Sequence, residues 1–170
     1  TPIAPRSNLD LTLAVALLKG EKFDLVVQKS VELGVSRIVP LKTKRADVKP
    51  KDDEKKLERW CKIALEACKQ CGRADLMTIE KTSDFEDFIK DCEGTKILLS
   101  ERGGAKFSSI NSSEKMIAII GSEGGWDDLE LESAAKNGFQ IVTLKGRILR
   151  AETAANLVAA VLQNRFGDMN

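Results

Sequence analysis

The sequence predicts one α/β domain built around a mainly parallel β-sheet. Short apolar runs alternate with stretches of helical spacing along the chain, which is the pattern of strand–helix–strand units. Two runs, 96–100 and 116–121, are compact and largely apolar, as strands are when helices cover both faces of a sheet. With 170 residues, 42% of them hydrophobic, the chain is long enough for a sizeable core.

The first half of the chain predicts two strands and two helices. Residues 9–16 alternate leucine with other residues and predict a strand. Residues 23–34 have apolar residues at helical spacing and end at Gly34, a natural left-handed cap, and 35–41 predict a second strand. A long helix is expected over 53–72. The core stripe of this helix is expected to consist of Leu57, Trp60, Cys61, Ala64, Leu65 and Cys68.

The next segments continue the alternation. Residues 76–80 predict a strand, and 83–92 predict a helix that opens with a capping box between Ser83 and Glu86. The two apolar strands described above follow, and 140–144 predict a further strand.

Two more helices are expected in the last third. Residues 127–138 predict a helix with an Asp127/Glu130 capping box and with Gly138 at its end. A final helix begins at residue 151 and ends near residue 166, and it is small or apolar on nearly all sides. We therefore expect it to be buried around most of its circumference, against a loop region or another subunit.

The four cysteines occur without any histidine. Cys61, Cys68 and Cys71 fall on one helical pattern, and Cys92 is the only further thiol. The sequence favours buried free thiols in a reducing compartment, and hence a cytoplasmic protein, over a zinc site or a redox pair. We therefore expect no metal. No apolar run approaches the roughly 18–20 residues of a membrane span, and no leader opens the sequence, so neither a membrane protein nor a secreted one is expected.

The net charge of +1 conceals local basic clusters. Residues 37–51 hold six lysines and arginines against Asp47 alone, and Lys145, Arg147 and Arg150 form a second cluster. Such clusters suit an anionic partner that is gripped at one face. The alternative is solubilising surface charge.

Glycine-bearing turns follow the later strands. Ligands of open α/β sheets bind outside the carboxyl ends of strands, and here these ends are 98–104, 119–126 and 144–153. Neither the dinucleotide pattern G-x-G-x-x-G after the first strand nor a P-loop is present. Glycines let backbone groups approach a ligand such as adenine, although ordinary strand-to-helix turns also use glycine. The apolar walls of such a pocket would be Leu99, Leu144, Ile148 and Leu149.

Four motifs in order resemble the RsmE-type small-subunit ribosomal RNA uridine N3-methyltransferases of the SPOUT superfamily. They are "LTLAVALLKGEKFDLVVQKSVELGVSRIVPL" (11–41), "EACKQCGR" (66–73), "IIGSEGGW" (119–126) and "RILRAETA" (147–154). The resemblance covers nearly the whole chain. It implies an S-adenosylmethionine-dependent enzyme that methylates N3 of a uridine in 16S ribosomal RNA, with its cofactor in a C-terminal trefoil knot. Alternatives are another SPOUT RNA methyltransferase, acting on transfer RNA or another ribosomal target, and a non-catalytic RNA- or nucleotide-binding module.

The sequence departs from the family pattern in two places, and it begins at a point well inside the length of a typical family member. The family usually has proline where Ser122 stands, and glycine directly after the leucine where Lys145 precedes Gly146. Family members also carry an N-terminal RNA-binding barrel of the PUA type, and this sequence begins about where that barrel should end. We therefore expect 1–8 to be a linker remnant and 9–170 to be the SPOUT domain. The resemblance also implies a homodimer.

The resemblance and the residues together suggest roles in the site. Arg150 is expected to stabilise charge on the uracil. Glu123 is expected to accept the proton, to hold a hydroxyl of the cofactor, or only to bond its own loop. The expected cofactor-binding residues are Leu98, Leu99, Ser100, Glu101, Gly121, Glu123, Gly124, Gly125, Leu144, Gly146, Ile148, Leu149 and Thr153.

A second group is expected to touch the RNA. Glu66, Gln70 and Arg73 recur at helical spacing and are expected on one polar stripe. Arg45 from the basic segment and Arg147 join them as expected contacts to ribosomal RNA. The alternative for the stripe is an ordinary exposed helix face.

Overall fold

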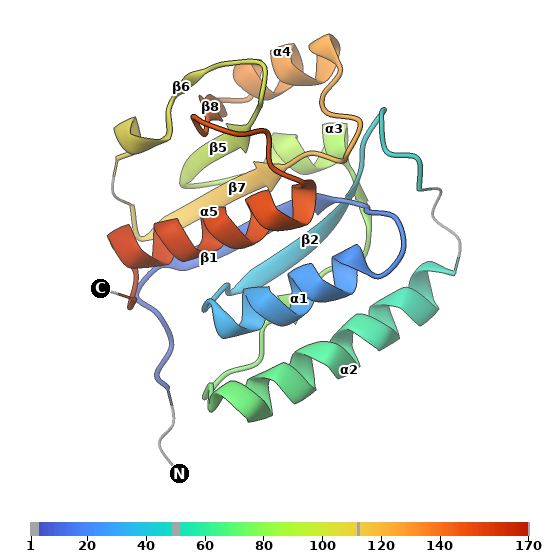
Figure 1. Ribbon diagram of the computed structural model, residues 1–170, viewed down its shortest axis with the longest axis vertical. Coiled ribbons are helices and arrows are strands. Elements are labelled where there is room, and N and C mark those ends of the chain that lie inside the picture. The colour runs from blue at the N-terminus through green and yellow to red at the C-terminus, as the bar shows by residue number, and fades with distance from the viewer. Residues whose placement is uncertain (1–3, 49–51, 112, 170) are drawn as a thin grey trace.

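The computed structural model describes residues 4–48, 52–111 and 113–169. Its eight strands form one sheet in the order β3-β2-β1-β7-β5-β8-β6, with β4 also paired to β2 (Figure 1). Every strand pairing in the described part of the chain is parallel. The predicted α/β class with a mainly parallel sheet is confirmed.

The strands differ widely in length, and the longest lie at the centre. The strands are β1 (Asp10–Ala16), β2 (Arg37–Lys42), β3 (Thr78–Ile79), β4 (Ser83–Asp84), β5 (Thr95–Leu99), β6 (Ala105–Lys106), β7 (Lys115–Ile120) and β8 (Gln140–Thr143). The helices are α1 (Lys22–Glu32), α2 (Asp53–Cys71), α3 (Phe85–Phe88), α4 (Asp128–Lys136) and α5 (Ala151–Phe166). Two 3₁₀ turns are η1 (Ile89–Asp91) and η2 (Phe107–Ser109).

Helices cover both faces of the sheet, so the central strands are buried on two sides. One core joins α1, α2 and α5 to one face, and Figure 1 shows these helices in front of the sheet. The other core joins the opposite face to Phe85 of α3 and Ala134 of α4. Successive residues of β7 therefore enter different cores, with Ala118 in the first and Ile119 in the second.

One expected helix boundary is wrong and another is confirmed. Residues 83–84 form a strand, and α3 starts only after it, so the Ser83/Glu86 capping box does not form. Glu86 instead accepts a hydrogen bond from the Ser133 hydroxyl at 2.5 Å. The Asp127/Glu130 capping box of α4 is present as expected. It depends only on residues three apart, whereas β4 depends on a partner strand far along the chain.

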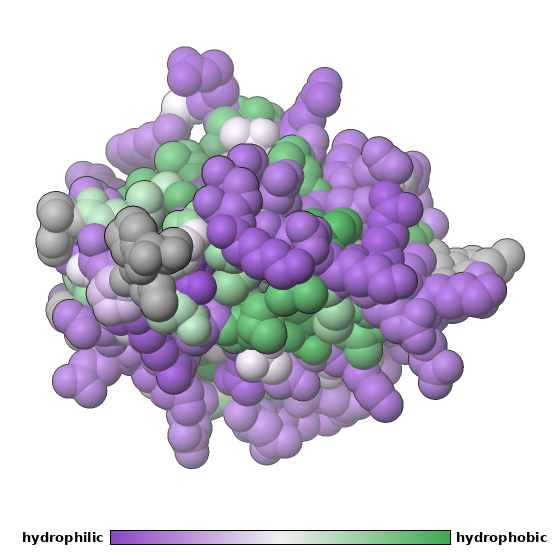
Figure 2. Space-filling view, turned by 90° about the horizontal axis from the view of Figure 1, so that it is seen from below, coloured by the Kyte–Doolittle hydropathy of each residue, from purple (hydrophilic) through white to green (hydrophobic). Residues whose placement is uncertain are grey.

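The face of α2 that is buried in the core is rotated relative to the predicted core stripe. The buried residues are Trp60, Ala64, Ala67 and Cys68, whereas Cys61 is exposed and Leu65 is 41% exposed. The expectation that the thiols are buried is therefore wrong for Cys61 and confirmed in full only for Cys68, since Cys71 and Cys92 are half-buried. All four cysteines are free. Figure 2, which views the molecule from the side of α2, shows an apolar area enclosed by hydrophilic side chains.

The last helix buries one face along its length, so the expectation that it is buried around most of its circumference is wrong: Thr153, Asn164 and Arg165 are exposed. Ala155, Val158, Ala159 and Leu162 are fully buried, while Leu157 remains 39% exposed. This helix packs against α1 and against the central strands β1 and β7. The trefoil knot and the assignment of 9–170 as a separate SPOUT domain stay predictions.

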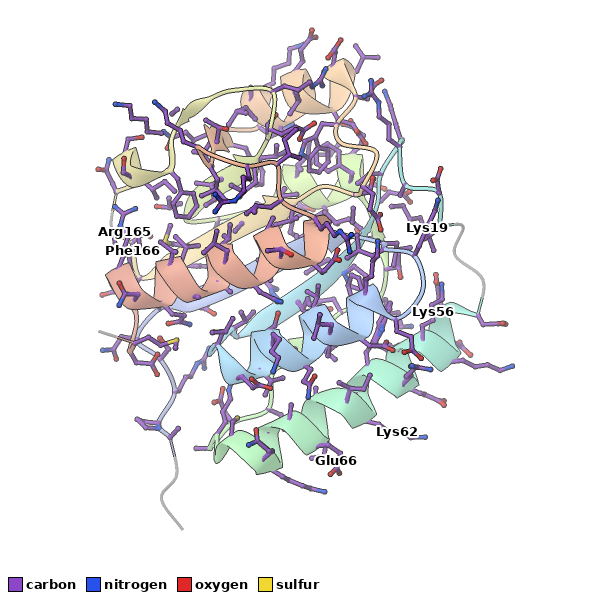
Figure 3. The ribbon with its side chains drawn as sticks, viewed as in Figure 1. Lys19, Lys56, Lys62, Glu66, Arg165 and Phe166 are labelled. Atoms are coloured by element: carbon purple, nitrogen blue, oxygen red, sulfur yellow. The ribbon has the colours of Figure 1, made fainter. Side chains whose placement is uncertain are left out.

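Arg73 lies inside the structure and not on the exposed stripe of α2. Its side chain is 7% exposed and donates hydrogen bonds to the carbonyl oxygens of Val31 and Val35 at 3.2 and 2.8 Å. It also forms a two-bonded ion pair with Asp75, at 3.0 and 3.2 Å. Placing Arg73 on one surface with Glu66 was therefore wrong, since Glu66 points outward from α2 (Figure 3).

Arg73→Ala is expected to destabilise the fold by about 2–3 kcal/mol. This is less than the ~3–5 kcal/mol of a fully buried pair, because Asp75 is a third exposed. The Arg73 guanidinium lowers the pKa of Asp75, so the ion pair stabilises the native state above the ordinary pKa of an aspartate. That stabilisation is lost as the pH falls through the lowered pKa.

Urea unfolding at neutral and acidic pH tests this. The wild type should lose stability on acidification more steeply than Arg73→Ala. Equal midpoints for the two proteins at neutral pH would contradict the assignment. Lys69→Ala, which removes an exposed cation from the same helix end, is the control.

Candidate functional site

A pocket of about 490 Å³ opens at the carboxyl ends of β5, β7 and β8. Its volume lies in the range of sites that hold small molecules and cofactors. Because these strands are parallel neighbours, the loops that follow them converge at one edge of the sheet. The lining residues are Leu99, Ser100, Glu101, Ile120, Gly121, Ser122, Glu123, Gly125, Trp126, Leu144, Gly146, Arg147, Ile148, Leu149, Arg150, Ala151 and Ala154.

Most of the residues expected to bind a cofactor lie in this lining, but three lie outside it. Leu98 is fully buried in the opposite core because neighbouring residues of a strand face opposite sides. Gly124 packs on the main chain of Arg45, and Thr153 is exposed on α5. The lining residues that sequence reasoning missed are Ile120, Ser122, Trp126, Ala151 and Ala154.

Trp126 anchors the segment 121–126, here called the glycine loop. Its indole N–H donates to the carbonyl oxygen of Leu99 at 2.7 Å, and its ring stacks at a tilt on Phe85 with centroids 5.1 Å apart. A Cβ on Gly121 would lie 3.0 Å from this ring, so any larger residue would have to displace the ring by a few tenths of an ångström. The tryptophan therefore joins the glycine loop to the end of β5.

Arg102 makes a second connection that the sequence did not indicate. It follows β5, donates to the carbonyl oxygen of Trp126 at 2.6 Å and pairs with Asp128 at 2.7 Å. The loop after β5 is thereby attached to the start of α4. Bonds over such sequence distances have no local signature.

Glu123 is held by a lysine from α1. Lys22 Nζ lies 2.8 Å from a carboxylate oxygen of Glu123, and both side chains are about one-third exposed. Partial burial opposes ionisation, but the Lys22 hydrogen bond and nearby backbone amides outweigh it and lower the pKa of Glu123. The carboxylate is therefore a weaker proton acceptor than an ordinary glutamate.

The segment 144–150 forms the other rim of the pocket. Arg150 is the N-cap residue of α5, with an extended backbone and an exposed side chain. Ile148 is 86% exposed although it lines the pocket, and Arg147 beside it is also exposed. Two guanidinium groups and an apolar side chain therefore border the opening.

The residues expected to touch RNA do not gather in one place. Arg45 is 45% exposed and lies beside the glycine loop. Glu66 and Gln70 are exposed near the C-terminal end of α2, away from the carboxyl ends of the strands (Figure 1). Lys49 and Lys51 of the basic segment lie outside the described residues.

No group of three or more cysteine and acidic side chains in residues 4–48, 52–111 and 113–169 is arranged to hold a metal ion. None of the helices in these ranges is both long enough and apolar enough to cross a membrane.

Known proteins resemble this chain in sequence and in structure. The profile of the RNA methyltransferase domain family matches residues 5–163. The ribosomal RNA small subunit methyltransferase E of Mesomycoplasma hyopneumoniae is 38% identical over 85% of this chain, and that of Synechocystis is 36% identical over 89%. The chain spans only 65% and 52% of the length of these two relatives.

A solved structure has the same fold. The ribosomal RNA small subunit methyltransferase E from Neisseria gonorrhoeae, crystallised with bound S-adenosylmethionine, superposes with a TM-score of 0.91 at 34% identity. The match covers 97% of this chain and 70% of that protein.

Proposed function

Because the chain belongs to the RNA methyltransferase family, among relatives named ribosomal RNA small subunit methyltransferase E, we propose that it transfers a methyl group from S-adenosylmethionine to N3 of a uridine in small-subunit ribosomal RNA. The pocket at the ends of β5, β7 and β8 is the observation that carries this proposal. It combines apolar walls with main-chain groups, as an adenosyl group requires.

The residues present fit the cofactor. Gly146 has a positive φ of 110° and open space where a Cβ would stand, and Gly121 lies against Trp126. Both let main-chain N–H and C=O groups reach an adenine edge. Leu99, Leu144 and Leu149 line the same pocket and would hold the adenosyl group between apolar surfaces.

The chemistry needs alignment and charge stabilisation. S-adenosylmethionine supplies a methyl group already activated by the adjoining sulfonium. The methyl–sulfur bond would break with its electron pair kept by sulfur while the methyl–N3 bond forms, and the N3 proton would pass to water at the exposed rim of the pocket. The Arg150 guanidinium at the rim would stabilise negative charge that develops on the uracil oxygens. Glu123 is better suited to hold a cofactor hydroxyl and its own loop than to remove the proton, since its pKa is lowered.

Calorimetric titration with S-adenosylmethionine tests the cofactor assignment. We expect saturable binding at one site per chain. Mass analysis of nucleosides from small-subunit ribosomal RNA incubated with the protein and cofactor should then show 3-methyluridine. Cofactor binding with a different methylated nucleoside would point to another RNA methyltransferase, and absence of cofactor binding to an RNA-binding module.

Arg45→Ala is expected to weaken RNA binding about equally for all sequences. It should also make the salt dependence shallower: the negative slope of the logarithm of the RNA association constant against the logarithm of the salt concentration should decrease in magnitude by about 1. The reason is that an exposed arginine beside the pocket would neutralise a phosphate. Fluorescence anisotropy with labelled RNA at several salt concentrations measures both quantities. Lys90→Ala, at an exposed cation of η1, is the control. An unchanged salt-dependence slope for Arg45→Ala would show that Arg45 does not contact the RNA.

We also propose that the chain forms a cytoplasmic homodimer and that its C-terminal third is knotted. Leu157 is an apolar side chain of α5 that stays 39% exposed, which supports a subunit contact there. Sedimentation at micromolar concentration should show a dimer, and a monomer alone would contradict it.

A further inference from the structure

The segment expected to contact RNA and the segment that lines the cofactor pocket are in direct contact. Residues 43–48 of the basic segment, here called the basic loop, lie against the glycine loop. The Ser122 hydroxyl donates to the carbonyl oxygen of Arg45 at 3.2 Å. A Cβ on Gly124 would lie 2.5 Å from the same oxygen, so no larger residue fits without displacing the basic loop. The φ of Gly124 is not in the left-handed region, so this contact is what requires glycine there.

A buried carboxylate joins the two segments more firmly. Glu130 of α4 is 1% exposed. One of its oxygens accepts from the Lys44 amide at 2.8 Å, and the other accepts from the Asp127 amide at 3.0 Å. Asp127 directly follows the glycine loop. Both carboxylate oxygens thus hold main-chain groups, one from each segment, in a buried setting where an unmade bond is costly.

The solvent-facing side of the contact between the basic loop and the glycine loop is charged and accessible. Asp127 pairs with Lys44 Nζ at 3.3 Å and lies 3.9 Å from the Arg45 guanidinium. The Arg45 and Lys44 side chains are 45% and 48% exposed. These two cationic side chains lie close to the glycine loop and are accessible enough to bind a phosphate group of RNA. The inner side of the same segment, at Ser122, Glu123 and Gly125, lines the pocket.

We propose that the basic loop and the glycine loop move as one body, so that RNA binding at Arg45 and cofactor binding in the pocket are coupled. This inference rests on the proposed function. A ligand that orders either loop orders the other through the Glu130 carboxylate and the Gly124 contact. The second ligand then meets a loop that is already ordered, and it binds more tightly. Linkage requires the effect to be equal in both directions.

Titration of S-adenosylmethionine with and without a short uridine-containing RNA at saturation tests the coupling. For the wild type we expect the cofactor Kd to fall about 5-fold or more when RNA is present. Glu130→Gln should reduce this ratio toward one. An amide has one oxygen, so its NH₂ group would face the Lys44 or the Asp127 amide as a second donor. Gly124→Ala should reduce the ratio as well, because its methyl group displaces Arg45.

Ser108→Ala, at an exposed serine of η2, should keep the wild-type ratio. Should Glu130→Gln not fold, Gly124→Ala alone decides. If the wild type takes up cofactor and RNA with independent affinities, the coupling is wrong and the proposed function stands. If Glu130→Gln and Gly124→Ala both keep the wild-type ratio of the cofactor Kd values without and with RNA, the contact between the two loops does not couple the ligands and the inference is overturned. If the wild type takes up no cofactor or no RNA, the proposed function fails and this inference fails with it.

Discussion

Arg150→Ala is expected to lower the rate constant of methyl transfer about 10²- to 10³-fold, with little change in the Kd for S-adenosylmethionine. Arg150 is the N-cap residue of α5, and its exposed side chain stands at the rim of the pocket. A cation there would act on charge that appears only as uridine N3 is methylated. Loss of an interaction made only in the transition state lowers kcat and not the affinity for the ground state.

Single-turnover methylation at saturating RNA and cofactor measures this effect. Arg150→Lys should recover part of the rate, because it keeps the charge but lacks the planar fork of donors. Arg147→Ala, at the neighbouring guanidinium, should change RNA affinity more than the rate of the chemical step. A wild-type rate constant for Arg150→Ala would exclude Arg150 from the reaction.

Trp126→Ala is expected to destabilise the fold by about 3–5 kcal/mol and to abolish measurable cofactor binding. The side chain is 1% exposed, fills the space beside Phe85 and satisfies the carbonyl oxygen of Leu99. Its removal leaves a cavity under the glycine loop and detaches that loop from β5. The pocket would then lose one of its walls.

Trp126→Phe separates packing from hydrogen bonding. It keeps an aromatic ring against Phe85 but leaves the Leu99 carbonyl without its donor, which costs about 1–3 kcal/mol. Urea unfolding and calorimetry with S-adenosylmethionine should therefore rank the proteins as wild type, Trp126→Phe and Trp126→Ala. An unchanged midpoint and affinity for Trp126→Ala would contradict the role assigned to this side chain.

Sequence patterns predicted those parts of the fold that depend on neighbouring residues. The capping box of Asp127 and Glu130 was predictable because its partners lie three residues apart. The bond from Lys44 to Glu130 spans 86 residues and has no local signature. Arg73 shows the same limit, since its helical spacing from Glu66 indicated a surface while its partners Val31 and Val35 come from another part of the chain.

The site was predictable in outline and not in every side chain. Parallel strands bring their carboxyl ends together, so segments such as 119–126 and 144–153 were expected to converge. Which residues of each segment face the pocket depends on strand and helix phase. Leu98 therefore points away from the pocket while Leu99 lines it, and Ala154 lines it while Thr153 does not.

If the pocket at the three strand ends binds an adenosyl group through main-chain atoms, a crystal structure of the protein grown with saturating S-adenosylmethionine should show this. We expect adenosyl density between the glycine loop and the segment 144–150, with the adenine edge bonded to backbone groups. Density for the cofactor elsewhere on the molecule, or none in a pocket left open by the lattice, would rule out this binding mode.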